Sequence, residues 1–71
     1  MNDAQRFWIE SAFSAQAVGK GGIIRRNISD VHRYAGYENF AAAAQERGFH
    51  MISVGDQYIV ICNPGSISLI F

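Results

Sequence analysis

The sequence has a single cysteine, Cys62, and therefore forms no internal disulfide. Its Cys and His residues do not have the spacing of a zinc finger, so a structural metal is not expected either. A chain of 71 residues buries only about 60 % of the surface that its unfolded form exposes, which leaves a marginal core. A partner chain is the remaining means of stabilisation.

Long apolar runs and an excess of one charge are also lacking. No apolar run is longer than five residues, as at 58–62, and such a run is too short to span a membrane. The start of the chain lacks the basic residues and the apolar stretch of a secretory signal. We therefore expect a cytoplasmic protein without a membrane partner. Six basic residues balance six acidic ones, whereas nucleic-acid-binding proteins usually carry a basic surplus.

The residues that are present indicate one folded α+β domain over 1–71. A hydrophobic content of 49 % with 17 % charged residues is typical of a globular chain. The spacing of the apolar residues predicts three helices. The first follows a cap at Asn2 or Asp3 and runs to about Val18, the second lies over 28–35, and the third over 37–47.

The other apolar segments predict an antiparallel sheet of three or four strands. The segment "GIIRR" at 22–26 is one short strand, and residues 49–54 and 57–62 flank Gly55-Asp56, a pair that suits a hairpin turn. After the turn "NPGS", the segment "SISLIF" at 66–71 predicts a last strand. The order of helix, strand, helix, helix and three strands is similar to that of a winged helix.

Two features of this pattern predict a homodimer. The first helix carries apolar residues on two sides, whereas a surface helix of a monomer needs only one apolar stripe. The last strand is an apolar edge, and such an edge invites pairing with another chain. The candidate interface residues are Phe7, Trp8, Ile9 and Phe13 on the helix, with Ile67, Leu69 and Phe71 on the strand.

Residues 27–49 also have the layout of a helix-turn-helix, which is the basis of an alternative function. The run "ISDVHRYAGYENF" resembles the second helix-turn-helix of AraC-type regulators, and this resemblance implies DNA binding. The candidate contacts are Asn39 and Gln45 to bases, with Lys20, Arg25, Arg26 and Arg33 to phosphates. However, Glu38 would be repelled by the DNA backbone, and the alanine run at 41–44 suits packing better than base reading. We therefore expect these helices to support the sheet.

The sequence offers little for catalysis or for metal binding. Cys62, His50 and His32 are the only soft ligands. The expected hairpin turn places His50 opposite Ile61, so the side chains of His50 and Cys62 project from opposite faces of the sheet. No paired carboxylates stand out, and no nucleophile has a neighbouring base. We therefore expect neither an enzyme nor a bound cofactor or metal.

A second resemblance covers most of residues 21–65. The segments "GGIIRR", "DVHRYAG", "RGFHMI" and "QYIVICNPG" look like those of a group of uncharacterised bacterial proteins of about this length. The resemblance implies a small, soluble, cytoplasmic protein and brings no catalytic or binding residue with it. Our first hypothesis is therefore a non-enzymatic interaction module that acts as a homodimer and has a further, unidentified protein partner. The alternative hypothesis is a winged-helix-like regulator that binds DNA.

Overall fold

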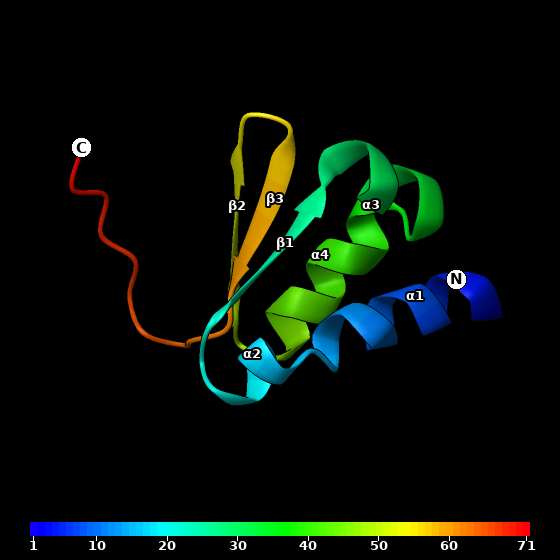
Figure 1. Cartoon of the computed structure of the whole chain (residues 1–71), viewed down its shortest axis with the longest axis horizontal. Helices are drawn as coiled ribbons and strands as arrows, with labels where there is room; N and C mark the ends of the chain where they lie inside the picture. The colour runs from blue at the N-terminus through cyan, green and yellow to red at the C-terminus, as the bar shows by residue number, and fades with distance from the viewer.

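The computed structural model describes all 71 residues as four helices and a three-stranded antiparallel sheet (Figure 1). The elements are α1 (Asp3–Phe13), α2 (Gln16–Gly19), β1 (Ile23–Asn27), α3 (Ile28–Tyr34), α4 (Tyr37–Glu46), β2 (His50–Val54) and β3 (Gln57–Ile61). The strand order is β1-β3-β2, so the strand between the first helices and α3 pairs with the second strand of the hairpin. The predicted α+β class is confirmed, and the elements up to the β2–β3 hairpin follow in the predicted order, with α2 as an additional short helix.

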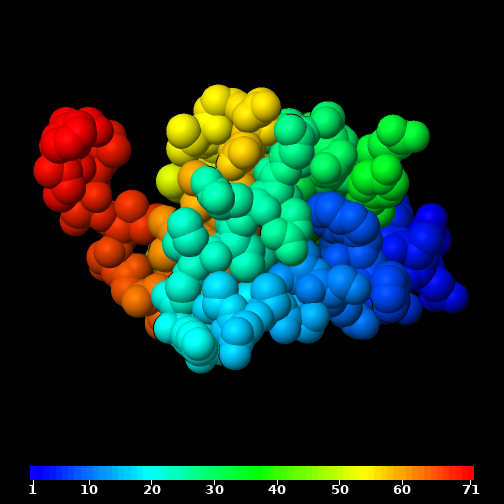
Figure 2. Space-filling model, viewed as in Figure 1, coloured from blue at the N-terminus to red at the C-terminus, as the bar shows by residue number.

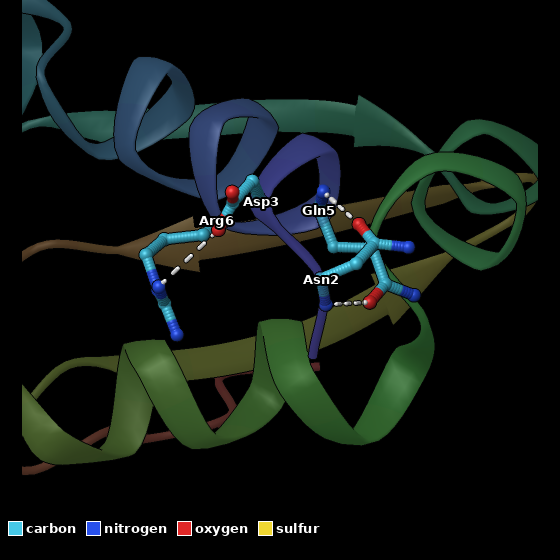
Figure 3. Close-up of polar contacts among 4 residues, drawn as sticks. All are labelled: Asn2, Asp3, Gln5 and Arg6. Carbon is cyan, nitrogen blue, oxygen red and sulfur yellow. Dashed lines mark hydrogen bonds and ion pairs between the residues drawn. The ribbon is translucent and has the colours of Figure 1, made fainter.

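The first helix begins after Asn2, one of the two N-cap residues that the sequence allowed. Asn2 is the N-cap: its side-chain oxygen accepts from the Gln5 N–H at 2.8 Å, and the Gln5 side chain accepts from the Asn2 N–H at 2.8 Å (Figure 3). This reciprocal capping box satisfies two N–H groups that the helix itself cannot bond. Asp3 follows in the first turn and forms an exposed ion pair of 3.7 Å with Arg6, which contributes little to stability.

The prediction that this helix continues to Val18 is wrong. The helix ends at Phe13, because Ser14 caps it and Ala15 then adopts an extended conformation with ψ 146°. The Ser14 hydroxyl donates to the Ser11 carbonyl at 2.9 Å, a local bond that competes with helix continuation. Residues 16–19 form a separate short helix, which turns the chain towards β1.

The two central helices form where the sequence predicts them, joined by a tight turn at Gly36. The Asn27 side chain caps α3 by accepting from the Ser29 N–H at 2.9 Å. Gly36 has φ +85°, a conformation that L side chains rarely adopt, and its N–H donates to the Val31 carbonyl at 2.8 Å. The Asn39 side chain spans the same turn by donating to the Ala35 carbonyl at 2.8 Å.

The core lies between the helices and one face of the sheet. Phe40 of α4, Val31 of α3 and Val60 of β3 are almost fully buried. The ring of Phe40 lies 5.4 Å from that of Phe13 and 5.9 Å from that of Trp8, which joins α1 to α4. The complete set of buried residues is Ile9, Ala12, Phe13, Ile24, Val31, Ala35, Phe40, Ala43, Ala44, Val60 and Cys62.

The expected last strand at 66–71 is not formed. In a meander this segment would pair with β3, but β1 already occupies that side of β3 and β2 occupies the other. Residues 63–71, here called the C-terminal segment, therefore leave the sheet without secondary structure. Figure 1 shows this segment to the left of the sheet, with the helices to its right. No helix of the structure is long and apolar enough to cross a membrane.

Candidate functional site

The sheet has one face that no helix covers. In the strand register, Ile23 of β1 lies beside Ile61 of β3, which lies beside His50 of β2. Alternate side chains share a face, so the residues of this face are separated from those that contact the helices. Its aliphatic residues are Ile23, Ile52, Val54, Ile59 and Ile61, and these five define what we call the open face.

The open face is exposed to a degree unusual for aliphatic side chains on a sheet. The exposed fractions of Ile23, Ile52 and Val54 are 51 %, 40 % and 57 %, whereas Ile24 and Val60 on the opposite face are at most 5 % exposed. Contiguous exposed apolar surface of this kind marks an interaction site more often than a free surface. The sequence pattern indicates the same feature, because Ile59 and Ile61 alternate with the half-buried Tyr58 and the buried Val60 and Cys62.

The C-terminal segment begins on the open-face side of the sheet. His50 lies in the same cross-strand row as Ile23 and Ile61, and its Nε2 atom is 2.7 Å from the Gly65 carbonyl oxygen. An Asn63 side chain that accepts from the Gly65 N–H at 2.7 Å closes the turn before it. Beyond this point the segment stands away from the body of the protein, as the red atoms of Figure 2 show. Leu69, Ile70 and Phe71 are almost completely exposed.

The interface predicted on the first helix is wrong for two of its four residues. Ile9 and Phe13 are 4 % and 6 % exposed, because both belong to the hydrophobic core. Trp8 is half-buried and stacks on Tyr34 at 6.1 Å, so Phe7, with 73 % of its side chain exposed, is the one large free residue of this group. By contrast, the predicted Ile67, Leu69 and Phe71 are all exposed, although not in a strand.

The candidate phosphate contacts come from different elements of the fold, and two of them, Arg25 and Arg26, line a common hollow. Lys20 follows α2, Arg33 lies on α3 with its guanidinium 5.5 Å from the ring centre of Tyr34, and Arg25 is exposed on β1. Arg26 points to the other face of β1, as predicted, and donates to the Arg25 carbonyl at 2.7 Å. A polar hollow of about 190 Å³ lies at this end of the sheet, lined by Arg25, Arg26, Asn27 and Gln57.

The helix that would read DNA is acidic on its solvent side. The exposed residues of α4 include Glu38 and Glu46 beside Gln45. The other base-reading candidate, Asn39, is half-buried and its amide is already bonded within the turn. Ala43 and Ala44 are buried, so this part of the alanine run packs against the core as predicted. The β2–β3 turn adds Asp56 and no basic residue.

The three candidate ligands for chemistry lie apart. His32 contacts the Tyr58 hydroxyl at 2.8 Å, His50 contacts Gly65, and Cys62 is buried in the core. His50 pairs with Ile61 as predicted, so it shares no sheet face with Cys62. No group of three or more His, Cys, Asp or Glu residues is arranged to hold a metal ion.

Burial raises the pKa of the Cys62 thiol, because a thiolate in the core would lose its hydration. The protonated thiol is thus favoured in the folded state. The stability that this contributes is complete below the unfolded-state pKa of about 8.5 and is lost as the pH rises above it.

We expect alkylation of Cys62 at pH 8 to be about a hundredfold slower in the native protein than in urea, since the reagent needs a local opening and a thiolate. A time course of iodoacetamide labelling followed by mass spectrometry measures both rates. Equal rates would show that the thiol is accessible and contradict its place in the core.

Comparison with known proteins adds no constraint to this description: no protein-family model matches the chain, and neither a curated protein nor a solved structure is significantly similar to it.

Proposed function

We propose that this chain is a non-enzymatic interaction module that works as a homodimer through the open face of its sheet. The observation that carries the proposal is one continuous aliphatic face opposite the helices, on which Ile23, Ile52 and Val54 are exposed and Ile59 and Ile61 are half-buried. A small core gains most from a partner that covers such a face. The scattered positions of His32, His50 and Cys62 support a role without catalysis. The single free Cys62 fits a reducing, cytoplasmic location.

Two copies that meet through this face would be related by a twofold axis, since the same patch on each then serves both. Arg25 is the charged residue of the face, at the middle of β1, with Ile59 and Ile52 beside it across the sheet. The methylene stem of Arg25 can cover aliphatic surface while its guanidinium reaches the solvent. The aliphatic residues then form the centre.

The test is to replace Ile52, at the centre of β2, by lysine. Ile52→Lys adds a charge to the proposed interface without touching the core, so we expect the dimer to dissociate at least tenfold more readily, with little change in the helical circular dichroism. Light scattering coupled to size-exclusion chromatography gives the molecular mass over a micromolar range of protein concentration.

The matched control is Phe7→Lys, which places the same charge on the large exposed residue of α1. The proposal expects this variant to dimerise as the wild type does. A monomeric wild type, or a dimer lost in Phe7→Lys and kept in Ile52→Lys, would contradict it; the second result would assign the interface to α1.

DNA binding is the second candidate, and the strand order with the α3–α4 turn is the observation that favours it. The carboxylates of α4 and the scattered basic residues oppose it, because affinity for DNA rests on phosphate contacts that act together. Salt-dependent binding of duplex DNA, lost when Arg25 and Arg26 are replaced by alanine, would reverse the order of the two candidates.

A further inference from the structure

Two apolar surfaces of this chain have no partner: the open face, and the side chains of the C-terminal segment. Leu69 and Ile70 are 89 % and 81 % exposed, and Phe71 is fully exposed. In Figure 2 the segment lies apart from the rest of the surface. Both surfaces belong to the same side of the sheet, since the bond between His50 and the Gly65 carbonyl holds the start of the segment there.

The topology prevents the segment from joining its own sheet. The free edges are β1 and β2, and both run antiparallel to β3. A segment that reverses direction after β3 would therefore run parallel to either edge. Parallel pairing needs a connection of about a dozen residues, whereas only the short "NPGS" turn at 63–66 separates β3 from the apolar residues. Pairing with an edge of its own sheet is therefore excluded, and in the structure the segment also stands away from its own open face (Figure 2).

The residue pattern of the segment suits a strand with one dry side. Ile67, Leu69 and Phe71 alternate with Ser66, Ser68 and Ile70, so in an extended chain these three apolar side chains point the same way, and the opposite side carries two serines and Ile70. Six extended residues span about 20 Å, slightly more than the roughly 17 Å of a five-residue strand. The segment is thus long enough to follow one strand of the open face from end to end.

We propose that the two copies of the dimer exchange their C-terminal segments, so that Ile67, Leu69 and Phe71 of each copy pack on the open face of the other. This inference rests on the proposed homodimer and names the part of the partner that covers each open face. When the two open faces are turned towards each other, each segment, which starts on that side at Gly65, lies between the two sheets on the partner's face, and the sheets do not touch directly. One twofold operation then covers both apolar surfaces of both copies.

The experiment combines two charged variants, Ile52→Lys on the face and Leu69→Glu on the segment. Each variant alone places a charge in both exchanged contacts, so each is expected to be monomeric at a concentration where the wild type is dimeric. A heterodimer of the two variants has one unchanged contact, between the segment of the Ile52→Lys chain and the face of the Leu69→Glu chain. Its other contact brings the new glutamate to the new lysine. Exchange therefore predicts that a heterodimer forms in the mixture, detected by native mass spectrometry with the two masses distinguished.

Circular dichroism of each variant first establishes that the monomers are folded, which is expected because both positions are exposed. If Leu69→Glu dimerises like the wild type while Ile52→Lys does not, exchange is overturned and the face-to-face dimer stands. A mixture in which both variants stay monomeric also overturns exchange. If Ile52→Lys still dimerises like the wild type, the dimer interface does not lie on the open face, and the proposed function is wrong.

Discussion

Replacing Phe40 by alanine is expected to lower the free energy of unfolding by about 3–5 kcal/mol. The side chain is fully buried and contacts the rings of Trp8 and Phe13, so its loss leaves a cavity that the rigid aromatic neighbours cannot fill. A domain of this size has a total stability of about 4–11 kcal/mol. The single change therefore removes a large part of the stability, and at the low end of that range it unfolds the protein.

Urea denaturation followed by circular dichroism measures this loss. All variants must be compared at one protein concentration, because dimer formation makes the apparent stability depend on concentration. Gln45→Ala is the control, since Gln45 is exposed on the same helix and its replacement is expected to change stability by less than about 0.5 kcal/mol. A loss below about 1 kcal/mol for Phe40→Ala would contradict the packing of α1 on α4.

The second large effect is expected at the turn between α3 and α4. Gly36→Ala forces an L side chain into φ +85° and places its Cβ 3.3 Å from the Asn39 amide nitrogen. The strain lowers the free energy of unfolding by about 1–3 kcal/mol. The new methyl group also crowds the Asn39 amide, which donates the hydrogen bond that closes the turn. Thermal unfolding should therefore show a clearly lower midpoint for this variant.

Gly19→Ala is the matched control for Gly36→Ala. Gly19 lies at the end of α2 without a positive φ, and a Cβ built there meets no atom within 4 Å. Alanine at this position is expected to be neutral or to stabilise by up to about 1 kcal/mol, because it restricts the unfolded chain. Equal effects of the two substitutions would show that the turn has no special conformation.

The sequence predicts those elements whose signals are local. The Asn27 cap, the Gly36 turn and the Gly55-Asp56 hairpin each depend on residues within one turn of the chain, and all three form as expected. The end of α1 at Phe13 is also local, but its cause is a serine bond that competes only weakly with the helix. Periodicity alone therefore extended the helix too far.

The elements that the sequence predicts wrongly depend on distant partners. Both β1 and residues 66–71 have a hydrophobic pattern that suits pairing with β3. The packing of the helices on the sheet decides which of the two segments pairs, and the pattern does not show this. The same reason explains Ile9 and Phe13: a helical wheel shows that α1 has two apolar sides, but not that the core covers the side of these two residues. The open face follows partly from alternation, yet its exposure depends on how few helices the chain has.

The central position of β3 has a consequence for how this chain folds. Ile23 and Asn27 are 38 and 30 residues away from their partners Ile61 and Gln57, whereas the β2–β3 hairpin closes over a two-residue link. Loops of that size close more slowly than hairpins, so we expect the hairpin to form first and β1 to dock on it. During synthesis, β1 and the α1 residues before it therefore wait for nearly the whole chain to leave the ribosome. β3, the last strand to be synthesised, thus provides the edge on which β1, the first strand, pairs.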